Sequence, residues 1–351
     1  MARIKGQGLR PLLRKMGPDA VGDLPGSGKM AQTQIDFDGW TRTPEGAAGA
    51  APGSGRRPKL PLLGVVALGG VLCLHTACMS WTRGWELGVP EAVPAQVTAT
   101  LEATRTTALE ADSRDRLLAA IARYQEVLAM APGNLEALSR LSEYHCLLGA
   151  AYSQRRRNKA DAYIQAIQYA ERAMSTNPQF RQAIERGQSL PEAAAALTLD
   201  EMDAMHFWVT GVSYYFKECL NPIRYPFNMT WMSRSTQVLE RMGELDADWS
   251  QGAVHFAWGI YYLALPKFAG GDMEKSAENL QRTLAVAPES LLGRWGRAKY
   301  FHVKTKNRQG FEDDLRWVLE QDPRAAASPY PWNVYFQRDA KRMLDEVDRY
   351  F

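Results

Sequence analysis

Four segments of this 351-residue chain end in the same way, and this repetition is the feature that most constrains the fold. In each segment, apolar residues recur at three- and four-residue spacing before a proline, at Pro132, Pro178, Pro288 and Pro323. That spacing places the apolar side chains on one face of a helix. Proline then stops the helix because it lacks the amide hydrogen that the helix requires. Strand-like patterns are scarce from residue 92 onward, so the sequence predicts an all-α fold.

Small residues stand at fixed offsets before these prolines, most clearly before Pro132 and Pro178 and more loosely before the other two. The set before Pro178 comprises Ala173, Ala170 and Ala166. This arrangement resembles the second helix of a tetratricopeptide (TPR) repeat, in which small residues let two helices approach closely. The spacing between the prolines is irregular. We therefore predict an α-solenoid-like bundle of degenerate TPR helix pairs over residues 80–351.

Two segments precede this helical region. Residues 1–59 contain eleven of the chain's 28 glycines and show no apolar period, which predicts a disordered N-terminal leader. Residues 60–79 begin with an apolar run that follows Arg56, Arg57 and Lys59, as in a secretory signal or a membrane anchor. Basic residues before such a run keep the N-terminus in the cytoplasm. Residues from about 80 onward are therefore expected on the periplasmic face of a bacterial membrane.

Cys78 is the candidate lipidation site. Thr76-Ala77-Cys78 fits the end of a bacterial lipobox, whose cysteine is acylated after cleavage, although His75 stands where an aliphatic residue is expected. The alternative is an uncleaved anchor over residues 60–79, because about twenty residues are enough to cross a bilayer. Both interpretations attach the body of the protein to the membrane.

Aromatic residues are concentrated between residues 200 and 268. Trp208 and Tyr215 share one face of a predicted helix, and Trp258 and Tyr262 share a face of another. Such stripes are most often part of a packed core. The alternative is a hydrophobic ligand channel between helices, in which phenol and indole hydrogens supply the few polar contacts. These four residues are the candidates for lining such a channel.

The chain carries no recognisable catalytic or metal-binding motif. Its five histidines do not pair with Cys, Asp or Glu at the spacing of metal ligands, and its four cysteines form no CxxC pair. Residues 60–351 hold 32 basic and 34 acidic residues, and a near-neutral body argues against nucleic-acid binding. We expect no enzymatic activity, no cofactor and no metal.

A specific order of residues runs from position 239 to position 288. It comprises Leu245-Asp246, Gly252-Ala253, Leu265-Pro266 and Gly270-Gly271-Asp272 before a TPR-like helix. This order resembles the signature region of the T component of tripartite ATP-independent periplasmic (TRAP) transporters, and the closing segment with Asn333 is similar as well. The resemblance covers about residues 70–351 and is strongest over 239–351.

The resemblance implies a membrane-anchored periplasmic protein that associates with the solute-binding protein of a TRAP-type importer. It also implies a homo-oligomer such as a trimer, with a hydrophobic channel in each subunit for a small organic acid or an apolar ligand. The alternative function is an envelope TPR scaffold that organises the subunits of another membrane complex. A neighbouring gene for a solute-binding protein would favour the first function.

The loop of the signature region, formed by Pro266, Gly270, Gly271 and Asp272, has a physical explanation in the sequence. Proline ends the preceding helix, and the two glycines permit backbone angles that are closed to other residues. Asp272 is placed to cap the first amides of the following helix. We expect a rigid connection, either a plain surface turn or part of the functional surface.

Overall fold

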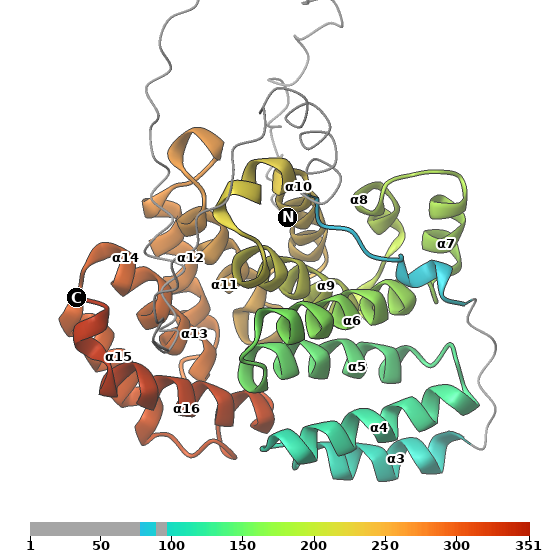
Figure 1. Ribbon diagram of the computed structural model, residues 1–351, viewed down its shortest axis with the longest axis horizontal. Helices are drawn as coiled ribbons and strands as arrows, with labels where there is room; N and C mark the ends of the chain where they lie inside the picture. Colours follow the sequence, from blue (N-terminus) through green and yellow to red (C-terminus); the bar gives the residue numbers. More distant parts are fainter. Residues whose placement is uncertain (1–77, 89–96) are drawn as a thin grey trace, which may run out of the picture. The chain divides into compact units, whose positions relative to one another are not determined.

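The computed structural model describes residues 78–88 and 97–351, and all regular structure within these ranges is helical (Figure 1). The predicted all-α fold is confirmed. The predicted leader, residues 1–59, and nearly all of the predicted signal or anchor, residues 60–79, lie outside the described residues. Within the described ranges, no helix is both long enough and apolar enough to cross a bilayer.

The N-terminal half of the body begins with a single-turn helix, η1 (Gly84–Glu86). The helices that follow are α3 (Val97–Ala108), α4 (Arg114–Met130), α5 (Leu135–Leu147), α6 (Arg156–Met174), α7 (Pro178–Glu185), α8 (Leu190–Ala193) and α9 (Met202–Tyr214). A π-helical turn, η2 (Leu148–Tyr152), extends α5, and another, η5 (Tyr215–Cys219), extends α9. Thr198 and Glu201 form the capping box that their spacing predicts, just before α9.

The C-terminal half starts with a single turn, η6 (Pro222–Arg224), that leads directly into α10. Its remaining elements are α10 (Tyr225–Leu245), α11 (Trp249–Ala264), η7 (Lys267–Ala269), α12 (Met273–Val286), α13 (Leu291–Gly296), the π-helical η8 (Arg297–His302), α14 (Val303–Thr305), α15 (Arg308–Glu320), α16 (Tyr330–Asp345) and η9 (Val347–Arg349).

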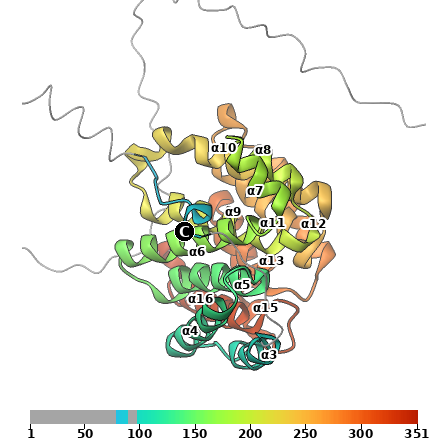
Figure 2. The ribbon, with the colours of Figure 1, turned by 90° about the vertical axis from the view of Figure 1, so that its right-hand side faces the viewer.

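Helices that follow one another in the chain pack against one another. Contacts run from α3 to α4, α5 and α6, then to α9, α10, α11 and α12, and finally through α13 to α15 and α16. Figure 2 shows the first part of this series, with α3 and α4 at one end and α5, α6 and α9 beyond them. Packing of successive helices is what a repeat array requires, and the TPR arrangement itself remains a prediction.

The helices before the four prolines end close to the predicted places. α4 ends at Met130, α6 at Met174, α12 at Val286 and α15 at Glu320. Pro178 does more than stop a helix, because it is the first residue of α7, where its missing amide hydrogen has no cost.

The predicted small residues lie at close helix contacts. The alanines at 166, 170 and 173 are fully buried, and Ser142 of α5 donates a hydrogen bond to the backbone oxygen of Ala166 at 2.8 Å. A similar contact joins α11 to α12, where the hydroxyl of Ser276 donates to the backbone oxygen of Gly259 at 2.8 Å. Small side chains therefore allow helix backbones to approach at both places.

The C-terminal helix returns to the N-terminal helices. The indole nitrogen of Trp332 in α16 donates a hydrogen bond to Glu143 of α5 at 3.1 Å, and Arg324 pairs with Glu110 at 2.7 Å. Figure 1 shows α16 next to α5 and α4. This return places residues from the start and the end of the body around the same interior space.

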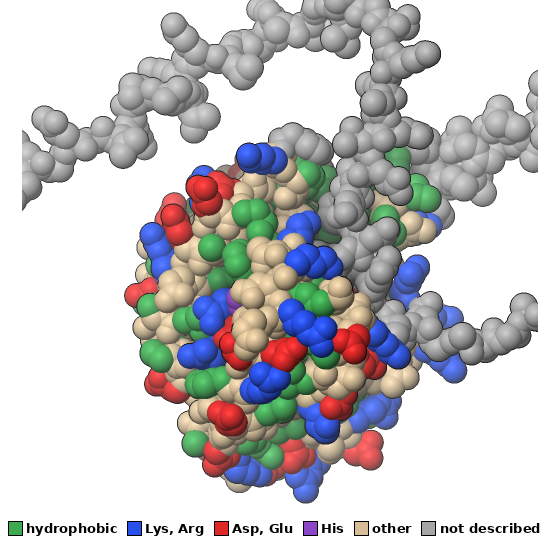
Figure 3. Space-filling view, turned by 90° about the vertical axis from the view of Figure 1, so that its left-hand side faces the viewer, with side chains coloured by type: hydrophobic (Ala, Val, Ile, Leu, Met, Phe, Trp, Pro, Cys, Tyr) green, Lys and Arg blue, Asp and Glu red, His purple; other side chains and the backbone are tan. Residues whose placement is uncertain are grey.

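Charged side chains of both signs lie interspersed on the face of the molecule shown in Figure 3. This pattern agrees with the near balance of acidic and basic residues in the body.

Candidate functional site

The body holds a cavity of about 240 Å³ between α9, α10 and α11, with α16 and the π-helical turns η5 and η8 at its edges, and the cavity is partly open to solvent. Most of its lining is apolar. The apolar lining residues include Phe207, Val209, Phe216, Met229, Met232, Leu239, Trp249, Phe256, Ile260, Leu265, Leu292 and Phe336. An apolar cavity of roughly 150 Å³ is already large enough to hold benzene, so this space is large enough for a small organic molecule.

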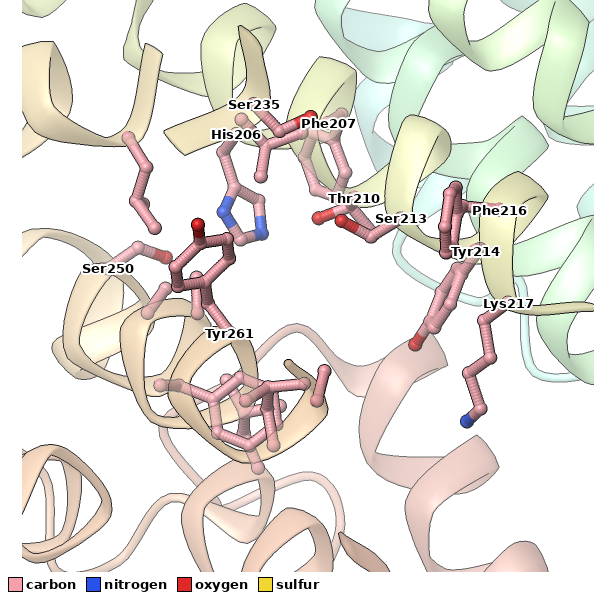
Figure 4. A pocket seen from close by; sticks show the side chains of 18 of the residues that line it. His206, Phe207, Thr210, Ser213, Tyr214, Phe216, Lys217, Ser235, Ser250 and Tyr261 are labelled. Carbon is pink, nitrogen blue, oxygen red and sulfur yellow. The ribbon is translucent and has the colours of Figure 1, made fainter. Parts of the chain in front are cut away.

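One face of α9 and η5 forms a wall of this cavity. Its lining residues are Asp203, His206, Phe207, Val209, Thr210, Ser213, Tyr214, Phe216 and Lys217. Most of them recur at the three- and four-residue spacing that keeps side chains on one helical face. Figure 4 shows this wall running from His206, which lies beside Tyr261 of α11, to Tyr214 and Lys217 at the far end of the open space.

The opposite wall comes mainly from α11, whose first turn has an unusual backbone. Ser250, Gln251 and Gly252 all have positive φ, at 48°, 57° and 75°, so the right-handed part of the helix starts only after them. A left-handed conformation costs roughly 1–2 kcal/mol for each residue with a side chain. Ser250 and Gln251 both line the cavity. Strained backbone of this kind is concentrated at functional sites.

Gly252 is required by the packing of this turn against α12. A side chain at this position would place its Cβ 3.1 Å from the Cα of Thr283, and φ is positive as well. The Thr283 hydroxyl also contacts the backbone oxygen of Gly252, at 3.4 Å. The Gly252-Ala253 pair of the signature region therefore sets the position of the strained cavity wall.

The charged residues at one edge of the cavity neutralise one another. Arg140 pairs with Glu143 at 2.6 Å and lies 3.7 Å from Asp203, and Glu143 accepts the hydrogen bond from Trp332. Burial raises the pKa of Glu143, and the neighbouring Arg140 acts against that rise. This edge is thus a closed network, and it leaves ligand contacts to the neutral polar groups of the lining.

Several hydroxyl groups are available for such contacts. Within the described residues, the hydroxyls of Thr210, Ser213 and Ser250 have no hydrogen-bond partner, and all three residues line the cavity. Lys217 lies at the other edge, with its ammonium group 4.3 Å from the centre of the Tyr300 ring. The arrangement combines a large apolar surface with a few hydroxyls and the ammonium group of Lys217, whose charge also acts on the neighbouring Glu218.

His206 faces the cavity from α9, and its ring lies 5.3 Å from that of Trp249. Burial lowers the pKa of His206 to about 4, because the charged form loses hydration. The imidazole is therefore neutral near pH 7, and it offers one donor and one acceptor.

None of the four sequence-predicted aromatic residues is among the residues that line this cavity. Trp208 is fully buried and donates a hydrogen bond to Glu171 of α6, so it belongs to the core. Tyr215 is partly buried on η5. Trp258 and Tyr262 are partly buried and stack on each other, with ring centres 5.5 Å apart. The cavity is lined instead by their chain neighbours Phe207, Tyr214, Ala257 and Tyr261.

The signature loop follows Leu265, the last residue of this segment that lines the cavity. Gly270 has a φ of 99°, and a Cβ on Gly271 would lie 1.8 Å from the backbone oxygen of Leu265. Asp272 caps α12, accepting hydrogen bonds from the amides of Glu274 and Lys275 at 3.0 and 3.1 Å. Pro266 stands at the start of η7, and its backbone oxygen accepts from the amide of Gly271 at 3.0 Å. The predicted cap is confirmed, and the loop is closed by its own hydrogen bonds.

Asn333 of the closing segment has a similar structural role. Its side chain is fully buried and donates to the backbone oxygens of Pro323, Ala326 and Ser328. These contacts hold the connection between α15 and α16, and Ser328 and Pro329 of this connection line the cavity.

Cys78, the candidate lipidation site, is exposed at the start of the described chain. Its sulfur lies 4.0 Å from the backbone oxygen of Phe227 at the start of α10. Among the described residues, no group of His, Cys, Asp or Glu side chains is arranged to hold a metal ion.

The residues that sequence reasoning did not select are the polar ones on the cavity face of α9 and η5. His206, Thr210, Ser213 and Lys217 recur at helical spacing within an otherwise apolar and aromatic stretch. A polar stripe in such a helix is a usable signal, because polar groups are costly to bury without a partner. The left-handed turn at Ser250 has no comparable signal apart from Gly252.

The fold and the site define an all-helical protein with a mainly apolar cavity of ligand size between its helices. Residues 142–351 match the family model of the TRAP transporter T-component, and the chain therefore belongs to this family. The resemblance seen in the sequence is confirmed, and the protein is an accessory component of a transporter. No curated protein matches the chain.

Proposed function

We propose that this protein acts at the periplasmic face of the membrane, where it associates with the solute-binding protein of its transporter and receives a small organic ligand in the cavity. The observation that carries the proposal is the cavity itself, about 240 Å³ in volume and lined mainly by apolar side chains. Ligand sites in proteins are typically apolar spaces with a few polar groups that fix orientation.

The chemistry of the lining indicates which class of ligand the cavity would bind. Phe207, Phe256 and Ile260 favour an apolar body, and the hydroxyls of Thr210 and Ser213 favour one or two polar atoms on it. Lys217 adds a positive charge at one edge, which suits the carboxylate of an organic acid. A hydrophobic organic acid satisfies all three features.

Filling the cavity tests the proposal directly. Ala257→Phe places a large side chain in the lining, whereas Ala103→Phe makes the same change on an exposed surface of α3. Each variant is produced in the full chain, and solute uptake is measured in cells that carry no other copy. We expect lost uptake for Ala257→Phe with a near-normal melting temperature, and normal uptake for Ala103→Phe. Normal uptake by a folded Ala257→Phe variant would contradict a ligand role for the cavity.

A separate experiment tests the proposed association with a solute-binding protein. The full-length protein is purified from its own membranes, and the proteins that accompany it are identified by mass spectrometry. We expect a periplasmic solute-binding protein. Consistent recovery of the subunits of an unrelated membrane complex would favour the scaffold function instead.

A further inference from the structure

The chain enters the body at one closely held point. Cys78 lies with its sulfur 4.0 Å from the backbone oxygen of Phe227, and the next residue, Met79, is buried. The amide of Met79 donates to the side chain of Asn228, and its backbone oxygen accepts from the indole of Trp231 at 3.2 Å. The start of α10 therefore binds the residues that follow the predicted membrane attachment.

Residues 81–84, which come next in the chain, also contact the body. The rings of Trp81 and Trp231 are 4.3 Å apart, and Arg83 pairs with the buried Glu171 at 2.6 Å. The amide of Gly84 also donates to Glu171. Because residues 79–84 are held in this way, Cys78 has no free linker between itself and the body.

An exposed apolar tip lies beside this entry point. We define the tip as residues 221–227, which form η6 and the first turn of α10. Ile223 is 77% exposed and Phe227 is 54% exposed, and Pro222 and Pro226 are exposed between them. Tyr225 is buried beneath, stacked on Phe216 with ring centres 4.7 Å apart. The tip therefore presents large apolar side chains to solvent from a supported backbone.

Basic residues accompany the tip. Arg224 is exposed within it. Three exposed arginines, residues 155–157, lie at the N-terminal end of α6. The thiol of Cys219 contacts the backbone oxygen of Arg156 at 3.8 Å, which places that run against the segment leading into the tip. Two acidic residues lie near the same cysteine: Glu218, which pairs with Lys159 at 2.7 Å, and the exposed Asp161. Positive charge therefore predominates beside the tip.

We propose that the tip inserts Ile223 and Phe227 into the surface of an anionic phospholipid membrane, with Arg224 and residues 155–157 on the lipid phosphates. This inference rests on the membrane location proposed above. An acyl chain on Cys78, or a span that ends at that residue, brings the bilayer to within a few ångströms of Phe227. Apolar side chains combined with a basic cluster are the features that bind a protein segment to the lipid interface.

Membrane insertion of the tip also fixes the orientation of the body. The attachment point and the tip together hold one end of α10 at the lipid surface, so the protein cannot rotate freely about a flexible linker. The cavity wall formed by α10 is thereby kept at a defined distance from the membrane components of the transporter.

Photocrosslinking in vesicles tests this proposal. The full-length chain is reconstituted into vesicles of phosphatidylethanolamine and phosphatidylglycerol, with photoreactive benzoylphenylalanine at position 223 or 227. Matched controls carry it at positions 109 and 199, where exposed leucines are 64% and 58% accessible. Lipid adducts are measured by mass spectrometry, and flotation with the vesicles reports membrane attachment independently.

We expect lipid adducts at positions 223 and 227 in large excess over positions 109 and 199. A triple variant, Arg155→Gln with Arg156→Gln and Arg157→Gln, should lower the adduct yield in anionic vesicles more than in phosphatidylcholine vesicles. Attached protein with equal adducts at all four positions overturns the inference and leaves the proposed location standing. Protein that does not float overturns both. The same positions are then crosslinked in cells, where adducts between the tip and a solute-binding protein in place of lipid would assign the surface to that partner and overturn the inference.

Discussion

Trp208 donates its indole hydrogen to Oε1 of Glu171 at 3.2 Å, and both side chains are fully buried. The same carboxylate accepts from the indole of Trp81 at 3.2 Å and pairs with Arg83. Burial raises the pKa of Glu171, whereas Arg83 and the N–H donors act against that rise. This cluster joins α6, α9 and the first described segment, and it gives Trp208 a structural role.

Replacing Trp208 should therefore cost stability. Trp208→Ala removes a fully buried ring and one donor to Glu171, and we expect a loss of about 3–5 kcal/mol in the free energy of unfolding. Trp258→Ala is the comparison, because that ring is only partly buried and its loss should cost clearly less. Chemical denaturation measures the free energy of unfolding of both variants. Equal losses would contradict the assignment of Trp208 to the core.

The signature loop gives a second prediction. Gly271→Ala should destabilise the protein by about 1–3 kcal/mol, because the new Cβ would meet the backbone oxygen of Leu265 at 1.8 Å. Gly243→Ala in α10 is the matched control, since its Cβ would have only a contact of 3.9 Å. That control should be neutral or stabilising, because alanine favours a helix over glycine. Thermal melts that show no difference between the two variants would rule out the close contact.

Loss of the cap on α12 is a separate, smaller effect. Asp272→Ala leaves the amides of Glu274 and Lys275 without their side-chain acceptor, and we expect a cost of about 1 kcal/mol. Asp272→Asn keeps an acceptor oxygen and should cost less. Urea denaturation compares the two, and an alanine variant as stable as the parent would show that the cap contributes nothing.

Because His206 is buried and neutral, we predict that the free energy of unfolding falls in acid. Its pKa is lowered to about 4 by burial, whereas an unfolded histidine titrates near 6.5. Between these values the unfolded chain binds more protons, so stability falls as pH drops through this window, by up to about 3 kcal/mol. His206→Gln should make the profile between pH 6.5 and 4 less steep. His145, whose pKa burial also lowers to about 4, accounts for part of the slope that remains. An unchanged slope in His206→Gln would contradict the buried neutral state.

Two adjacent tyrosines allow the effect of a hydroxyl inside the cavity to be compared with that of a hydroxyl outside it. Tyr261 lines the cavity and Tyr262 does not, so Tyr261→Phe and Tyr262→Phe delete the same hydroxyl from different surroundings. We expect weaker solute uptake at low solute concentration only for Tyr261→Phe, by up to about tenfold, as for the loss of one hydrogen bond. Equal uptake by the two variants would show that the Tyr261 hydroxyl does not contact the ligand.

Much of the local structure follows from the sequence alone. Apolar spacing predicted the helices, prolines predicted their ends, and Asp272 and Thr198 predicted caps that the structure confirms. These features depend on residues within a few positions of one another, so a single stretch of sequence contains all the groups that interact. The signature region also identified the family, because its order of residues is specific.

The position of the cavity was decided by the tertiary structure. α9 is mostly apolar and aromatic, so its polar stripe singles out one face of the helix but does not tell whether that face meets a neighbouring helix or a pocket. Trp208 and His206 are two residues apart, about 200° around a helix, and packing against Glu171 of α6 turns Trp208 into the core and His206 toward the cavity. Contacts such as that between Cys78 and Phe227 join residues 149 positions apart. Only the folding of the whole chain brings such residues together, and no local pattern records it.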